Sequence, residues 1–198
     1  MDITHADSTP LKLALVVASN REGRFAPVVA AWFRARLAER ADYTVDVVDL
    51  ADVDLPVLTH HPDDAASAEL AKVSPVLAAA DAFVVLTPEY NHSFPAPLKS
   101  LVDWHYTEWR AKPVGFVSYG GISGGLRAVE QLRQVFAELH AVTVRDTVSF
   151  HNAHGDFDED GSHQDPTGPD AAAKTMLDQI AWWAHALRNA KSVRPYGA

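Results

Sequence analysis

The sequence predicts an α/β protein built on a doubly wound, five-stranded parallel sheet with helices on both faces. Five short apolar runs rich in β-branched residues alternate with five longer segments of helical periodicity along the 198 residues. Most of the short runs are apolar throughout, as expected for central parallel strands that helices cover on both sides. We therefore expect one domain over 11–190, flanked by a polar tail over 1–10 and a C-terminal tail over 191–198.

The first half of the chain is predicted to form two strand–helix pairs. Its strands are expected over 11–18 and 43–50, and its helices over 25–40 and 65–80. Pro27 falls in the first turn of the first helix, where the missing N–H would have been unpaired anyway. Pro75 lies inside the second helix, which predicts a kink or a later start there.

The third strand, over 83–86, is followed by a polar loop and a helix that ends near Trp104. Thr87 and Pro88 are expected to end the strand, because proline has no N–H to give to a central ladder. The loop 89–92 then leads into a helix with two prolines in its first turn. In open α/β sheets ligands bind at such loops, beyond the carboxyl ends of the strands. The functional site is therefore expected at the carboxyl end of the sheet.

The second half of the chain completes the alternation. Strands are expected over 113–119 and 141–150, helices over 126–139 and 171–190, and a long polar loop over 151–168. The segment 141–150 alternates apolar with polar residues and is interpreted as an edge strand. With right-handed crossovers, the predicted strand order is 2-1-3-4-5.

Composition and charge exclude several classes of function. The net charge of -9 argues against a nucleic-acid partner and against anionic membrane surfaces. No apolar run approaches the roughly 18 residues of a membrane span. The segment 1–10 lacks the basic and apolar regions of a signal peptide, so we expect a cytoplasmic protein. Because the chain has no cysteine, disulfides, thiol chemistry and cysteine–zinc sites are excluded, and any redox chemistry must use a bound cofactor.

The loop after the first strand has the residue types of a phosphate site. Neither a G-x-G-x-x-G nor a G-x-x-x-x-G-K-[ST] pattern occurs, which argues against a Rossmann dinucleotide site and against a P-loop. Instead, this loop carries several hydrogen-bond donors close together. They are the hydroxyl of Ser19, the guanidinium groups of Arg21 and Arg24, and the helix N-terminal amides that begin near Gly23. Such donors suit a phosphate monoester dianion. On these residues alone, the alternative that both arginines are solvated surface charges has about equal weight.

Three motifs together resemble the NADPH-dependent FMN reductase family, a flavodoxin-like family that includes bacterial quinone, chromate and azo-dye reductases. The motifs are Ser-x-Arg-x-x-Arg from Ser19, Thr-Pro-Glu-Tyr-Asn over 87–91, and Ser-Tyr-Gly-Gly from Ser118 with Gly124, Gly125 and Arg127. They occur in the family's order after the expected strands 1, 3 and 4, and the resemblance runs from about 11 to 190. One departure is Ala18, where the family usually has glycine.

The resemblance implies non-covalently bound FMN, with NADPH or NADH as the electron donor. The phosphate would be held by Ser19, Arg21 and Arg24, with the amides of Gly23 and Phe25 nearby. The isoalloxazine would lie along Pro88, Glu89, Tyr90 and Asn91, which would offer main-chain N–H groups to its pyrimidine edge. Its other side would be closed by Ser118, Gly120 and Gly121. Two alternatives stay open: Tyr90 as an aromatic cap on the core, and Glu89 in a structural salt bridge or an interface contact.

The implied reaction is a ping-pong transfer of hydride from nicotinamide C4 to flavin N5 and then to a quinone-like or other small acceptor. No protein residue is assigned to proton transfer, because the flavin carries the chemistry. A flavodoxin-type electron carrier without nicotinamide turnover is the alternative, and a protein that only binds FMN or another phosphorylated ligand is a third. Flavodoxin phosphate loops are typically rich in Ser and Thr, so the two arginines favour the reductase. No motif decides between NADH and NADPH or identifies the acceptor.

Aromatic residues near the end of the helix after the third strand suggest an assembly. Trp104, Tyr106 and Trp109 are of the type favoured at interfaces. Members of the family are typically dimers or tetramers, so we expect a homodimer or homotetramer. The alternative, that these aromatics pack against the protein's own sheet, has about equal weight.

The loop 151–168 and the histidines give weaker signals. The histidines at 60–61 and in 151–154 are interpreted as surface residues instead of metal ligands. The run 156–161 copies the opening of an EF-hand loop, but its twelfth position is Thr167, where a glutamate is required. A solvated acidic loop is therefore the better interpretation. As a further hypothesis, the whole loop reaches over the flavin of a neighbouring subunit.

Overall fold

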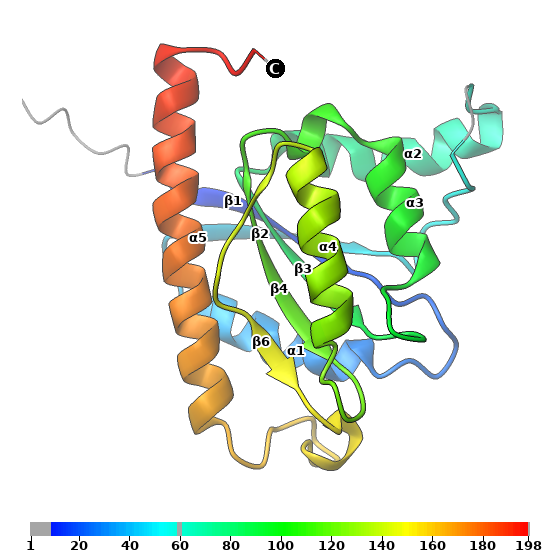
Figure 1. The fold of residues 1–198 in the computed structure, drawn as a ribbon, viewed down its shortest axis with the longest axis vertical. Coiled ribbons are helices and arrows are strands. Elements are labelled where there is room, and N and C mark those ends of the chain that lie inside the picture. The colour runs from blue at the N-terminus through cyan, green and yellow to red at the C-terminus, as the bar shows by residue number, and fades with distance from the viewer. Residues whose placement is uncertain (1–8, 59–60, 198) are drawn as a thin grey trace, which may run out of the picture.

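The computed structural model describes residues 9–58 and 61–197 and has a parallel sheet between two layers of helices (Figure 1). Most of the predicted tail at 1–10, and His60, lie outside the described residues. The strands are β1 (Leu11–Val17), β2 (Tyr43–Asp49), β3 (Ala82–Pro88), β4 (Pro113–Tyr119), β5 (Val142–Thr143) and β6 (Val148–Phe150). The helices are α1 (Ala26–Ala38), α2 (Asp64–Ala79), α3 (Ala96–Trp104), α4 (Leu126–Glu138) and α5 (Thr167–Val193).

The strand order is β2-β1-β3-β4-β5, all parallel, with β6 also paired to β4, which confirms the predicted order. The register places Val17 beside Leu86 and Thr87 beside Ser118. The carboxyl ends of β1, β3 and β4 are therefore level, and the loops that follow them emerge at one edge of the sheet.

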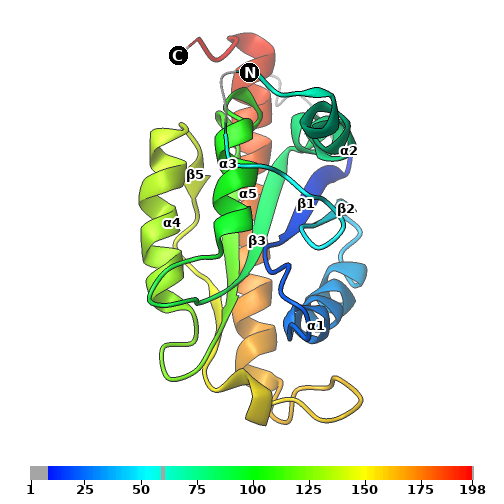
Figure 2. The same cartoon turned by 90° about the vertical axis from the view of Figure 1, so that its right-hand side faces the viewer.

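Two hydrophobic cores separate the sheet from its helices. Leu13 and Leu15 face the core under α1 and α5, whereas Ala14 and Val16 face the core under α2, α3 and α4. This alternation is the period of two expected of a strand covered on both sides. α5 runs along the whole length of the sheet (Figure 2). None of the helices in the described ranges is long and apolar enough to cross a membrane.

The fifth strand differs from the prediction over 141–150, because it is divided into β5 and β6, which pair with β4 separately. Between them the chain leaves the ladder, and Val144 turns inward to the core. Arg133 from α4 donates to the carbonyl oxygens of Val144 and Arg145 at 2.7 and 2.9 Å. These side-chain donors replace the ladder, so the interruption leaves both carbonyls paired.

Several predicted limits shift by a few residues. β3 continues to Pro88, which is its last residue, so only the final rung of the ladder lacks a donor. α2 begins directly after Asp63, whose side chain accepts from the N–H of Ala66 at 2.8 Å, and it runs unbroken through Pro75. The predicted later start is therefore wrong, because the N-cap fixes the first turn. α5 extends beyond 171–190 at both ends, which shortens the predicted C-terminal tail.

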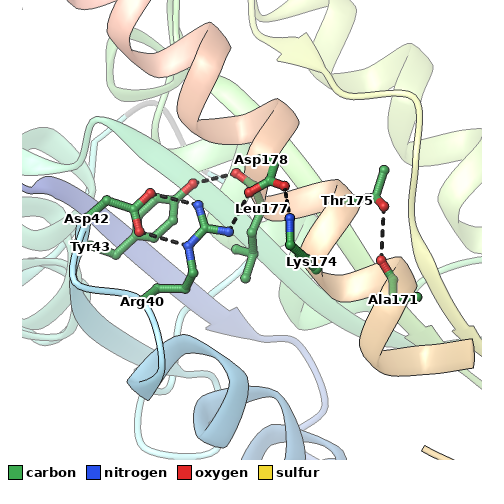
Figure 3. A network of polar contacts seen from close by, with 8 residues as sticks. All are labelled: Arg40, Asp42, Tyr43, Ala171, Lys174, Thr175, Leu177 and Asp178. Carbon is green, nitrogen blue, oxygen red and sulfur yellow. Dashed lines mark hydrogen bonds and ion pairs between the residues drawn. The ribbon is translucent and has the colours of Figure 1, made fainter. Parts of the chain in front are cut away.

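Polar contacts tie the edge of the sheet to α5 (Figure 3). Arg40 donates to Asp42 at 2.7 and 2.8 Å and to Asp178 at 2.6 Å. The buried hydroxyl of Tyr43 donates to the carbonyl oxygen of Leu177 at 2.7 Å. These contacts fix α5 against β2 on the side of the molecule away from the predicted site.

Lys112 is a buried ammonium group that predicts a pH-dependent stability. Its side chain donates to the carbonyl oxygens of Leu77 and Ala78 at 3.0 and 3.1 Å and lies over the Phe83 ring. Burial, with a smaller effect of Lys191, lowers its pKa from 10.5 to about 8. Between these two values the unfolded chain binds a proton that the folded chain does not. The free energy of unfolding should therefore rise from pH 8 to pH 10.

The full shift corresponds to roughly 3 kcal/mol, an upper limit for this rise. Urea denaturation of the wild type at about pH 7.5 and about pH 10 measures it. The variant Lys112→Met has no such proton to bind, so its stability should change little over the same interval. An equal rise in that variant would contradict the assignment to Lys112.

Candidate functional site

The loops after β1, β3 and β4 lie together at the carboxyl end of the sheet, toward the lower end of the view in Figure 1. The hydroxyl oxygens of Ser19 and Tyr90 are 2.7 Å apart, although 71 residues separate them in the chain. Glu89 forms an ion pair with Arg127, with 3.0 Å between Oε1 and Nη1. The structure thus brings the three sequence motifs to one place.

A cluster of three hydroxyl groups stands at the end of β1. Ser19 is fully buried, its hydroxyl is hydrogen-bonded with the phenol of Tyr90, and it also acts on the pKa of the Tyr119 phenol. Burial raises the pKa of Tyr119, so its phenol stays protonated and remains a donor. The guanidinium of Arg21 lies 5.5 Å from the centre of the Tyr90 ring. Tyr90, which was predicted to lie along a flavin ring, therefore has its hydroxyl beside the predicted phosphate residues.

Arg24, a predicted phosphate ligand, is engaged by groups of its own chain. Its guanidinium forms a two-pronged ion pair with Asp49 at the end of β2 and also donates to the carbonyl oxygen of Ser19 at 2.6 Å. Both carboxylate oxygens of Asp49 are engaged, so the charge of Arg24 is already neutralised. Arg24 therefore holds the loop, and Arg21 is the guanidinium that stays exposed beside the hydroxyl cluster.

The N-terminus of α1 offers main-chain donors to the same place. Within the described residues, the N–H groups of Gly23 and Phe25 make no hydrogen bond, and no side chain caps the helix. Gly23 has a φ of 65°, a conformation that glycine adopts without strain. Unpaired N–H groups at the positive end of a helix attract an anion. These two amides lie where the sequence predicted phosphate donors.

The turn 89–93 is a tight hairpin with two non-glycine residues at positive φ. Asn91 and His92 have φ values of 50° and 70°, and Tyr90 and Ser93 exchange main-chain hydrogen bonds at 2.8 and 3.0 Å. The N–H of Glu89 donates to a carbonyl of β4, and Pro88 has no N–H. Of the four predicted main-chain donors, therefore, Asn91 alone has no acceptor in the part of the chain that the structure describes. Among the described residues, the N–H of His92 is also without a hydrogen bond.

Glu89 forms the structural salt bridge that was one of its two predicted alternatives. Its side chain is only 8% exposed and accepts from both the main-chain N–H and the guanidinium of Arg127, at 3.2 and 3.0 Å. Burial alone would raise the pKa of Glu89, but hydrogen bonds from Ser123 and Arg127 outweigh it and hold that pKa below its usual value. The carboxylate therefore stays ionised at the N-terminus of α4.

The loop between β4 and α4 depends on two glycines with positive φ. Gly124 and Gly125 have φ values of 60° and 84°. Ser118, predicted to close over the flavin, is fully buried, and its hydroxyl donates to the carbonyl of Gly124 at 2.8 Å and so holds this loop. Gly120 packs closely on Gly125, because a Cβ added to Gly120 would lie 3.3 Å from the main-chain nitrogen of Gly125. In the described part of the chain, nothing lies within 4 Å of a Cβ on Gly121, which leaves room for a ligand.

The segment after β6 packs on the site loops of the same chain. Phe157 is buried, and its ring and that of His154 lie against Phe25, with centroids 5.6 and 4.4 Å away. The main-chain N–H of Asn152 donates to the carbonyl of Gly121 at 2.9 Å. The rings of His154 and Phe157, which helped to prompt the hypothesis of a reach toward a neighbouring subunit, thus pack within this chain.

The acidic run 156–161 is occupied with local contacts. Asp160 accepts from the N–H and the hydroxyl of Ser162 at 2.9 and 2.6 Å, and Asp158 accepts from Gln164 at 3.1 Å. Over residues 9–58 and 61–197, no group of three or more His, Cys, Asp or Glu side chains is placed to hold a metal ion.

Two residues of this site were missed at the sequence level. Asp49 ends β2 and pairs with Arg24, and the rule that strand ends converge could have pointed to it. Gln131 donates to the carbonyl of His92 at 2.9 Å and accepts from the hydroxyl of Ser93. Its signal was its position four residues after Arg127, on the same face of α4.

A family model and curated relatives all identify similarity to NAD(P)H-dependent reductases. Residues 11–155 match the family model described as NADPH-dependent FMN reductase. An NAD(P)H-dependent FMN reductase of Saccharomyces cerevisiae is 34% identical over 146 residues, which cover 65% of this chain and 75% of that protein. A probable NADPH:quinone oxidoreductase of Oryza sativa is 32% identical over 128 residues, which cover 62% of this chain and 63% of that protein.

Solved structures agree on the fold. The flavoenzyme NAD(P)H:(acceptor) oxidoreductase from Paracoccus denitrificans has a TM-score of 0.67 at 21% identity, covering 89% of this chain and 98% of that one. The two-electron reduced flavodoxin of Megasphaera elsdenii has a TM-score of 0.54 at 13% identity, covering 88% of this chain and 98% of that one. At these identities the likeness establishes the fold alone, which is flavodoxin-like as predicted.

Proposed function

Because this chain belongs to the NADPH-dependent FMN reductase family, we propose that it binds FMN non-covalently at the carboxyl ends of β1, β3 and β4. NADPH or NADH would be the electron donor, and a quinone-like or other small molecule the acceptor. The observation that carries the proposal is the convergence of phosphate donors and unpaired main-chain N–H groups on the loops that the family motifs occupy.

The phosphate end of the site fits a monoester dianion. Donors of four kinds meet there: the Ser19 hydroxyl, the Tyr90 phenol, the Arg21 guanidinium and the N–H groups of Gly23 and Phe25. Charge-assisted hydrogen bonds to phosphate are stronger than neutral ones, and the N-terminus of α1 adds to them. Arg24 would contribute by holding the carbonyl of Ser19 and so fixing the loop.

The ring end of the site fits the isoalloxazine. The N–H groups of Asn91 and His92 would face its pyrimidine edge, and Gly121 would let the main chain approach the other side. Bound FMN supplies the hydride-accepting N5 atom, which this chain lacks among its own side chains. The N–H donors would favour negative charge at the pyrimidine edge, and no side chain here is assigned a proton. The chain would thus bind, orient and electrostatically bias the cofactor.

The proposal includes self-association as a homodimer or homotetramer. Trp109 no longer supports it, because this side chain is fully buried against Phe83 and Phe136, with centroids 4.5 and 5.3 Å away. Tyr106 is 47% exposed, and the indole of Trp104 donates to the carbonyl of Pro56 at 2.8 Å. One of the three aromatic residues therefore belongs to the core, and the assembly and a cytoplasmic location stay predictions.

The test is an absorbance spectrum of the purified protein, repeated after anaerobic addition of NADPH. We expect flavin bands that bleach within the time of one catalytic turnover and return when a quinone is added. Flavin bands that persist with both NADPH and NADH would favour an electron carrier or a binding protein. A protein that contains no flavin and does not bind added FMN would overturn the proposal.

A further inference from the structure

The turn 89–93 holds two consecutive residues with a Cβ in the left-handed region, although Asn and His tolerate that region better than most side chains. Asn91 and His92 adopt the left-handed region, which carries a steric cost for any residue with a Cβ. Non-glycine residues stay in that region where the surrounding structure holds them, and such positions gather at functional sites. The turn bears the N–H groups that the proposed function assigns to the flavin. What holds the turn therefore bears on how the site works.

One face of α4 supplies the contacts that hold the turn. The amide of Gln131 donates to the carbonyl of His92 at 2.9 Å, and its oxygen accepts from the hydroxyl of Ser93. Arg127, one helical turn earlier, holds the carboxylate of Glu89. Residues four apart lie on the same helix face, so the beginning and the tip of the turn are tied to one rigid support.

We propose that Gln131 is a positioning residue for FMN, which acts by fixing His92 and Ser93 so that the N–H groups of Asn91 and His92 stay aimed at the pyrimidine edge. This inference rests on the proposed function. Charge grows at that edge when the flavin is reduced, and preorganised donors stabilise it most when they cannot turn away. A loosened turn should therefore weaken binding of reduced FMN more than binding of oxidised FMN.

The test compares Gln131→Leu with Gln134→Leu. Gln134 is the same residue type on the same helix and is exposed, and within the described residues its side chain makes no hydrogen bond. We expect Gln131→Leu to raise the dissociation constant of oxidised FMN about tenfold, as the loss of two hydrogen bonds to the turn suggests. The constant for reduced FMN should rise about tenfold more, which shifts the two-electron potential by about 30 mV to the negative. Gln134→Leu should change neither quantity.

Fluorescence titration gives the FMN affinity, and a redox dye titration gives the potential. If Gln131 served only the fold, both oxidation states would weaken equally and the potential would stay unchanged, which would overturn the inference. Should Gln131→Leu not fold, Ser93→Ala removes one of the two contacts without altering α4. A wild type that binds no FMN would overturn the proposed function as well.

Discussion

Replacing Gly125 by alanine is expected to lower the free energy of unfolding by about 3 kcal/mol or more. Alanine is strained in the left-handed conformation of this residue, and its Cβ would overpack the loop. Gly125 has a φ of 84°, and a Cβ there would lie 2.6 Å from the Cβ of Ser118 and 3.0 Å from the nitrogen of Tyr119. Neither neighbour is the free end of a flexible side chain. The loop must therefore move as a whole.

The consequence should reach the site as well as the fold. Ser118 is fully buried and holds the loop through its hydrogen bond to Gly124, and Tyr119 shares the hydroxyl cluster with Ser19. A displaced loop thus disturbs the predicted phosphate end and ring end together. We expect Gly125→Ala to lose most of its FMN affinity even where it stays folded.

Urea denaturation measures the loss of stability, with Gly155→Ala as the matched control. In the structure a Cβ on Gly155 has nothing within 4 Å, and its φ is not positive, so that variant should stay within about 0.5 kcal/mol of the wild type. Equal stability of the two variants would show that the loop of Gly125 moves without cost, and would contradict the conformational argument.

Periodicity and apolar runs were enough to predict the sheet order and the helices, because burial on two faces decides which residues the strands carry. They failed where side chains outside a segment decide its path. Arg133 replaces the ladder between β5 and β6, and nothing within 141–150 indicates a donor arriving from α4. Trp109 shows the same limit. The sequence pattern of an aromatic residue after a helix is the same whether its side chain packs in the core, as here, or binds a partner chain.

The sequence motifs predicted which loops carry the candidate site, and those loops lie together in the structure. Motifs identify which loops meet, because strand ends converge at one edge of the sheet. They do not reveal which polar groups are already paired with each other. Arg24 looked like a phosphate ligand because Asp49, its partner, is 25 residues away in the chain. Likewise, the sequence does not reveal that the N–H groups of Glu89 and Tyr90 already donate to carbonyl oxygens, one in β4 and one within the hairpin.

Replacing each of the two arginines of the phosphate loop by alanine is expected to affect different properties, FMN affinity for Arg21 and stability for Arg24. Arg21 is exposed and, among residues 9–58 and 61–197, its guanidinium contacts only the ring of Tyr90, so Arg21→Ala should leave stability within about 0.5 kcal/mol of the wild type. It should raise the dissociation constant of FMN by roughly 10- to 100-fold, the effect of losing a charge-assisted hydrogen bond to phosphate. Arg145→Ala is the matched control, because that arginine is 90% exposed and distant from the motifs.

Arg24→Ala should instead destabilise the protein before any cofactor is added. It leaves the half-buried carboxylate of Asp49 without its partner and releases the carbonyl of Ser19, which together should cost about 2 kcal/mol. Its FMN affinity should also fall, because Ser19 is no longer fixed. The double variant with Asp49→Ala should recover part of the stability, because it removes the uncompensated charge.

Urea denaturation without FMN and fluorescence titration with FMN, applied to all four variants, separate the two roles. The structure predicts a loss of stability for Arg24→Ala that Arg21→Ala does not share. If Arg24→Ala kept full stability and lost only FMN affinity, the ion pair with Asp49 would be dispensable for the fold. Arg24 would then leave Asp49 when the phosphate binds, and the role that the sequence first suggested for it would be the correct one.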